Sequence, residues 1–203
     1  MDIGLVNSVS STSEVKSVKN TAYSQQTSKV DYSNYSIADL RKVPYEEAKS
    51  NYDAIMNRSF ELDTGEASAK ELSGLSAQLF ATKVTDNDNF KKSLYNTLQN
   101  IENGPDAFVA YGEVMQNLKE YASGTQDIKP SFMVNDNFTT YKEPTRLQIN
   151  SIDFSDFISK MINEFSDSSN AKGEVKKQYQ NITDAYITLQ KSYENEVRKP
   201  YYA

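Results

Sequence analysis

Apolar residues recur three and four positions apart along most of this chain, the spacing that places side chains on one face of an α-helix. Proline, glycine and Asp/Asn residues interrupt these runs where helices commonly begin or end. Six helices are predicted in this way, over residues 44–58, 67–83, 86–102, 105–123, 152–165 and 173–198. The pattern therefore predicts an all-α fold, a single helical bundle of about six helices within residues 37–200.

The boundaries of the middle helices depend on particular residues. Thr85-Asp86 is predicted to cap the third helix, and Asn103-Gly104 to end it, because glycine is the usual left-handed residue after a helix end. Pro105-Asp106 starts the fourth helix, since proline in the first turn loses no hydrogen bond. The apolar stripe of this helix consists of Phe108, Tyr111, Met115 and Leu118, at spacings of 3, 4 and 3.

Residues 125–149 lack the helical spacing of the segments on either side. Two short apolar runs, Phe132–Val134 and Phe138–Tyr141, surround the polar turn Asn135-Asp136-Asn137. A short β-hairpin near residues 131–142 fits this pattern, and an extended loop across the bundle fits it equally well.

Residues 1–36 differ in composition from the rest of the chain. Nine serines and three threonines make up a third of this segment, and its three acidic and three basic residues cancel. Such a segment buries too little apolar area to offset the roughly 1–2 kcal/mol per residue that ordering the backbone costs. We therefore predict a disordered Ser/Thr-rich arm ahead of the helical domain.

The last helix carries a regular seam of aliphatic and tyrosine side chains. The seam alternates spacings of four and three, as in coiled coils, and begins at Val175. Helix packing inside a bundle uses the same spacing. Because each buried tyrosine hydroxyl needs a partner, we predict the seam at the edge of the bundle, where its rings can also meet another protein. The predicted partner-binding residues are Tyr179, Ile182, Tyr186, Leu189 and Tyr193.

The composition excludes several classes of function. The 203-residue chain contains no Cys, His or Trp, which excludes disulfides, zinc-thiolate sites and catalysis by Ser-His-Asp or Cys-His groups. A net charge of −6 and a pI near 4.8 argue against nucleic acid or an anionic membrane as the main partner. The sequence shows neither a membrane span nor a Sec signal peptide. No cofactor is expected.

Carboxylates are the one catalytic route that remains, and no motif favours it. TDNDNF at 85–90 alternates acidic residues as a calcium loop does, but Lys91 stands at the glycine position and Thr97 at the glutamate position. Helix capping explains this run better. Glu113 and Asp153 lie next to apolar residues and are the best candidates for a buried catalytic carboxylate. We predict no metal site and no enzymatic activity.

The opening residues resemble the leaders of proteins exported by flagellar or virulence type III secretion systems. Those systems read an unstructured, serine-rich N-terminus, and MDIGLVNSVSS is also similar to the start of small proteins encoded among flagellar genes of AT-rich proteobacteria. The resemblance implies export through a narrow channel that admits only unfolded chain. The chain lacks the N-terminal heptad helix of rod, hook and filament subunits, which points away from a building-block role.

Two functions fit these observations. The first is a non-enzymatic protein-interaction protein that is exported or flagellum-associated, cytoplasmic before export, and addressed by residues 1–36. The second is a cytoplasmic helical chaperone or adaptor that binds a partner's amphipathic helix along the tyrosine seam. In the second case residues 1–36 are dispensable and the seam is essential. An enzymatic function would require paired, buried carboxylates with a raised pKa.

Overall fold

A computed structural model describes residues 30–130, 142–167 and 171–198 of the chain. All helices and contacts of the described part lie within residues 31–198. The described residues form only α-helices, without a strand, which confirms the predicted all-α fold. The helices are α1 (Ile37–Arg41), α2 (Tyr45–Ser50), α3 (Tyr52–Leu62), α4 (Glu66–Ala81), α5 (Asp88–Gln99), α6 (Gly104–Ala122), α7 (Arg146–Asn150), α8 (Phe154–Ser166) and α9 (Gly173–Arg198).

All six predicted segments are helical, but the described part of the chain has nine helices instead of about six. The first predicted segment is divided into α2 and α3 at Asn51, where the backbone leaves the helical region with φ −114° and ψ 25°. The sequence pattern also misses α1 and α7. Each begins with a capping box, Ser36 with Asp39 and Thr145 with Gln148, which satisfies the N–H groups of the first turn.

Two predicted boundaries around α5 are wrong. The helix begins after Asn87, whose side-chain oxygen accepts a hydrogen bond from the Phe90 N–H, rather than after Thr85-Asp86. Gly104 does not follow the end of α5 as a left-handed residue but is the first residue of α6. Close packing requires glycine there, because an added Cβ would clash with the carbonyl oxygen of Lys70 in α4.

Small residues bring α4 and α6 close together. A Cβ added to Gly74 of α4 would lie 2.8 Å from the Cα of Gly104, so the two backbones almost touch at this point. Small buried residues continue along both helices, with Ala77 and Ala81 on α4 and Ala107 and Ala110 on α6. Because the helices are this close, large side chains of α6 do not fit between them.

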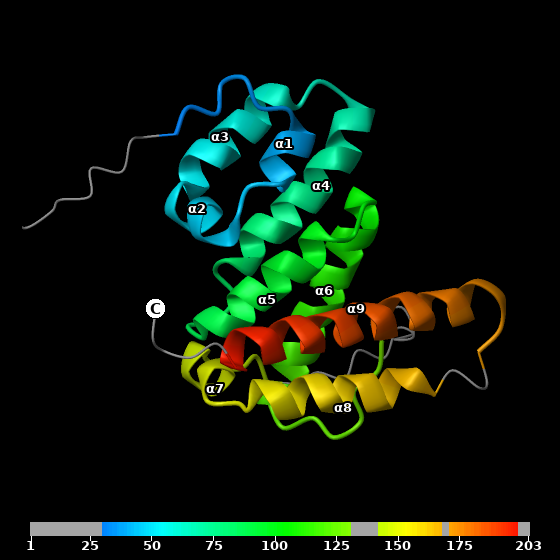
Figure 1. Ribbon diagram of the computed structural model, residues 1–203. Coiled ribbons are helices and arrows are strands. Elements are labelled where there is room, and N and C mark those ends of the chain that lie inside the picture. The colour runs from blue at the N-terminus through cyan, green and yellow to red at the C-terminus, as the bar shows by residue number, and fades with distance from the viewer. Residues whose placement is uncertain (1–29, 131–141, 168–170, 199–203) are drawn as a thin grey trace, which may run out of the picture. The chain divides into compact units, whose positions relative to one another are not determined.

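The helices pack around α5, which contacts α2, α4, α6 and α9. α4 packs against α6 and α1, and α9 packs against α8 (Figure 1). In Figure 1, α8 runs alongside α9, α1 and α3 lie beside α4, and α2 lies next to α3. The core is therefore formed by α5 with α4 and α6 on one part of its surface and α9 with α8 on another.

The described body begins earlier than the predicted boundary at Ile37. Tyr32 is only 4% exposed, and its hydroxyl donates to the Glu47 carboxylate at 2.9 Å. Arg58 of α3 donates to the Tyr35 carbonyl oxygen at 3.2 Å. These contacts attach residues 32–35 to α2 and α3, so they belong to the helical body rather than to the predicted arm. Residues 1–29 of that arm lie outside the described residues.

The predicted loop or hairpin at residues 125–149 is only partly described. The hairpin near 131–142 lies outside the described residues except for Lys142. Its C-terminal part contains α7, where a loop was expected. Arg146 holds α7 in place by donating to the Lys83 carbonyl oxygen at 2.9 Å and to the Asp86 carboxylate at 2.7 Å.

Candidate functional site

The predicted partner-binding seam of α9 lies in the core of the domain. Four of its five residues are buried, and Tyr179 is half-buried. The predicted position at the edge of the bundle is therefore wrong, because α8 and α5 both pack against α9. The four buried residues are Ile182, Tyr186, Leu189 and Tyr193.

Tyr186 shows how a tyrosine seam is accommodated inside the domain. The centroid of its ring lies 6.0 Å from that of Phe157 and 5.8 Å from that of Phe165, both on α8. Its hydroxyl accepts a hydrogen bond from the side-chain amide of Asn117 on α6 at 2.9 Å. Burial raises the pKa of Tyr186, so the hydroxyl stays protonated at neutral pH. The partner that a buried hydroxyl needs is thus supplied within the domain.

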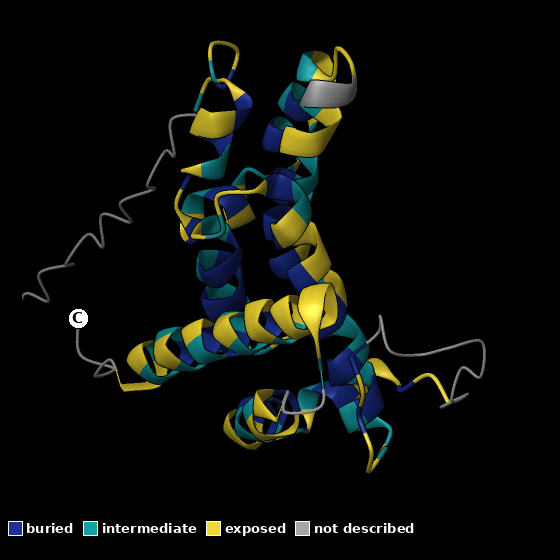
Figure 2. Ribbon diagram, turned by 90° about the vertical axis from the view of Figure 1, so that its right-hand side faces the viewer, coloured by how far each residue is buried: buried dark blue, intermediate teal, exposed yellow. Residues whose placement is uncertain are grey.

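The N-terminal end of the seam extends beyond the helices that cover the rest of it. Residues 173–181 are exposed apart from the half-buried Tyr179, and Val175 is 37% exposed. In Figure 2 these first turns of α9 face the viewer and are mostly yellow. Only Val175 and Tyr179 of the seam are therefore open to a partner.

A different surface, on α6, exposes apolar side chains together. Phe108 is 45% exposed and Val109 is 58% exposed, and Gly112 is also exposed. Tyr111 and Met115 are half-buried beside them. Phe80 of α4 joins them, because its ring centroid lies 5.9 Å from that of Tyr111. We call this surface the α6 outer face, and it consists of Phe80, Phe108, Val109, Tyr111, Gly112 and Met115.

The apolar stripe predicted for α6 does not face the core as a whole. Only Leu118 of that stripe is buried, and the core-facing positions before it are Ala107, Ala110 and Val114. The close approach at Gly74 and Gly104 explains the difference, because it admits only small side chains between α4 and α6. With the small residues turned inward, the large apolar residues Phe108, Tyr111 and Met115 are turned outward.

Next to its small apolar residues, the inner side of α6 also carries a buried polar row. Glu113 is 2% exposed, Asn117 is completely buried and Glu120 is 8% exposed. Their spacings of four and three place them on one side of the helix. Asn117 faces α9, where it binds Tyr186, and its Oδ1 atom has no hydrogen-bond partner among the described residues. An ordinary surface helix keeps its charged side chains outside and its large apolar side chains inside, and α6 departs from this pattern at Glu113, Glu120 and Phe108.

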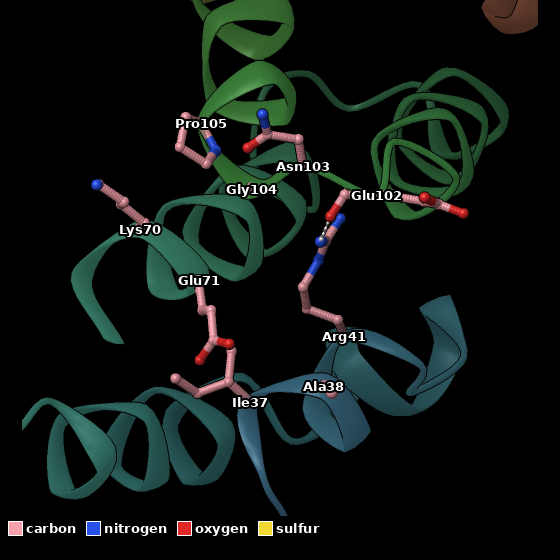
Figure 3. A pocket seen from close by; sticks show the side chains of 9 residues that line it. All are labelled: Ile37, Ala38, Arg41, Lys70, Glu71, Glu102, Asn103, Gly104 and Pro105. Carbon is pink, nitrogen blue, oxygen red and sulfur yellow. Dashed lines mark hydrogen bonds between the residues drawn. The ribbon is translucent and has the colours of Figure 1, made fainter. Parts of the chain in front are cut away.

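A pocket of about 310 Å³ opens where α1, α4 and the start of α6 meet (Figure 3). Arg41 is its central basic residue, and its guanidinium donates to the Gln78 side-chain oxygen at 2.9 Å. Three further hydrogen bonds of 2.6 to 3.1 Å reach the carbonyl oxygens of Leu98, Ile101 and Glu102. Arg41 thus caps the C-terminal end of α5, and this pocket is a structural junction rather than an anion site.

The two candidate catalytic carboxylates have different surroundings. Glu113 is buried on the inner side of α6. Asp153 is exposed and caps α8, since its carboxylate accepts a hydrogen bond from the Asp156 N–H at 3.0 Å. The two residues therefore do not provide the pair of buried carboxylates that a catalytic role would require.

The acidic residues of TDNDNF bind protein groups. Asp88 accepts hydrogen bonds from the Lys49 ammonium at 2.6 Å and from the Tyr45 hydroxyl at 2.8 Å. Burial raises the pKa of Asp88, but these hydrogen bonds outweigh burial and lower it to about 2. Asp86 pairs with Arg146 instead. In the described ranges, no three acidic side chains gather in a way that could hold a metal ion.

None of the described helices is both long and apolar enough to cross a membrane. No protein-family model, curated protein or solved structure matches this chain. The exposed residues of α6 therefore provide the best basis for a functional proposal, and no feature of the sequence other than their spacing points to them.

Proposed function

We propose that this chain is a non-enzymatic protein-interaction protein and that it binds a helix on the α6 outer face. The observation that carries the proposal is the reversed pattern of α6, with Phe108 and Val109 exposed and Glu113 and Glu120 buried. Scattered exposed apolar residues are normal on soluble proteins, but a contiguous apolar patch marks an interaction surface.

The spacing on α6 favours a helix as the bound element. Phe108, Tyr111, Gly112 and Met115 stand at i, i+3, i+4 and i+7, which is the spacing of helix-to-helix packing. Gly112 lies within the helix, where glycine costs about 1 kcal/mol relative to alanine. A Cβ added there would meet no atom within 4 Å, so no packing within the domain requires this glycine. A helix backbone that approaches α6 closely would use this space.

Photocross-linking in the native host tests this surface. A photoreactive phenylalanine analogue replaces Val109, or as a control Lys191, which is exposed on α9. We expect a discrete protein adduct from position 109 that Phe108→Glu abolishes, and no such adduct from position 191. Equal adducts from both positions, or none from position 109, would contradict the proposal.

We also propose that the protein is exported by, or associated with, a flagellar or type III secretion system, and that residues 1–29 act as the address. The serine-rich composition of the opening residues supports this proposal. If the protein is instead a cytoplasmic chaperone or adaptor, it uses the same α6 outer face and residues 1–29 are dispensable.

Secretion of C-terminally tagged protein distinguishes these two functions, and the boundary at residue 30 defines the deletion to use. We expect the protein in the culture supernatant of the wild-type strain, but not in a strain that lacks the export ATPase or after deletion of residues 2–29. A deletion of residues 2–36 is the less suitable variant, because it also removes the buried Tyr32 and the N-cap Ser36. Retention in the cell under all conditions would contradict export.

A further inference from the structure

We propose that the partner of the α6 outer face is a second copy of this chain, with the two α6 helices packed antiparallel about a two-fold axis. This inference rests on the proposed function, because it names the occupant of the same surface. Two-fold interfaces are the commonest in soluble oligomers, and they require a surface that is complementary to itself.

The shape of the α6 outer face meets this requirement. Phe108 projects from the helix with 45% of its surface exposed, and Gly112 leaves open space one turn later. In an antiparallel pair, Phe108 of each copy fits the space above Gly112 of the other copy. The interface therefore makes this knob-and-hole contact twice, once from each copy.

The charges at the two ends of α6 fit the same arrangement. Glu102 is exposed just before the helix, and Lys119 lies near its end on the side of the outer face. The register that places Phe108 over Gly112 brings Lys119 within one position of Glu102 of the second copy. Lys119 already binds Glu143 at 2.6 Å, and its ammonium has further N–H groups for a second carboxylate. This register thus brings a basic and an acidic residue to neighbouring positions at both ends of the contact.

The antiparallel arrangement is also favourable for the helices themselves. The N-terminal end of each α6, with its partial positive charge, lies beside the C-terminal end of the other. Between the charged ends, the apolar side chains of the two outer faces cover each other and leave contact with water. A parallel pair would place Lys119 beside Lys119 and Glu102 beside Glu102, so charge favours the antiparallel pair.

Sedimentation velocity of the full chain, measured at protein concentrations up to about 200 µM, tests this inference. We expect a species of twice the 22.9 kDa chain mass. Phe108→Glu and Gly112→Leu should each weaken dimerisation on the order of thirtyfold or more. The melting temperature of Gly112→Leu should not fall, because the new side chain enters open space on the monomer. Retention of full dimer affinity by both variants would overturn the inference.

Charge reversal identifies the antiparallel register. Glu102→Lys and Lys119→Glu should each weaken the dimer on the order of three- to tenfold, and the double variant should restore it, because each copy then carries both reversed charges. No weakening by either single variant would overturn the proposed register.

The same measurement separates this inference from the proposed function. A wild-type chain that stays at 22.9 kDa up to about 200 µM overturns the dimer. If cross-linking from position 109 then yields an adduct with a different protein, the α6 outer face is still a binding surface. If cross-linking yields no adduct either, both proposals fail.

Discussion

Replacing Tyr186 with alanine is expected to lower the free energy of unfolding by about 4 kcal/mol, the range for deleting a large buried aromatic ring. The ring is fully buried against Phe157 and Phe165, and its hydroxyl holds the amide of Asn117. A change of this size corresponds to roughly 10–15 °C in Tm for a domain of this length. Urea unfolding followed by circular dichroism measures it.

This expectation differs from the one drawn from the sequence, which counts Tyr186 among the partner-binding residues. The matched control is Tyr186→Phe, which keeps the ring and removes only the acceptor of the Asn117 hydrogen bond. It should cost about 1–2 kcal/mol, since a buried donor loses its partner. A loss of less than about 1 kcal/mol with Tyr186→Ala would contradict this account, because it would show that the ring is not packed in the core.

Replacing Arg41 with alanine is expected to lower the free energy of unfolding by about 3 kcal/mol. The guanidinium makes four hydrogen bonds, one to a carbonyl oxygen in the last turn of α5, two to carbonyl oxygens between α5 and α6, and one to Gln78 on α4. Without it, these carbonyls lose their hydrogen bonds, and α1 keeps only the bonds that Gln78 and Gln99 donate to its Arg41 carbonyl oxygen, together with the packing of its buried side chains. Arg41→Ala should therefore also loosen α1, which native-state hydrogen exchange can detect.

Arg198→Ala provides the control for a general effect of lost positive charge. Arg198 is exposed at the end of α9 and pairs with Glu194 four residues earlier at 3.0 Å. Exposed pairs of this kind contribute less than about 0.5 kcal/mol. Equal losses of stability in the two variants would show that the Arg41 network does not hold the helices together.

The helices were predictable from the sequence because their apolar spacing and punctuation are local signals. All six predicted segments are helical, and Pro105 marks the start of α6 as expected. The errors arose where a residue has a tertiary role. Gly104 resembles a helix stop, yet it begins a helix, because the close contact with Lys70 of α4 is not visible in the local sequence.

The exposed apolar face of α6 could not be predicted, because spacing alone does not say which side of a helix faces the core. On α9 the seam has the regular spacing of an interface and is instead covered by α8 and α5. On α6 the large apolar residues follow helical spacing too, but alanines are buried in their place. In both helices the neighbours determine which side is buried. On α9 these neighbours are α8 and α5, and on α6 the short distance to α4 admits only small side chains.

Stability and binding are therefore expected to depend on different helices. Substitutions of the buried seam residues of α9 should destabilise the domain, whereas substitutions on the α6 outer face should leave its stability largely unchanged and alter association. This separation allows the role of the α6 outer face to be examined in a folded protein.

Thiol labelling of single-cysteine variants tests most directly whether the free apolar surface lies on α6 rather than on the α9 seam. The chain has no cysteine, so Val109→Cys and Leu189→Cys each create a unique thiol. At submicromolar concentration, Val109→Cys should react within about tenfold of the rate in denaturant, and Leu189→Cys should be protected at least about a thousandfold. Labelling of Leu189→Cys in the folded protein as fast as Val109→Cys would contradict the account.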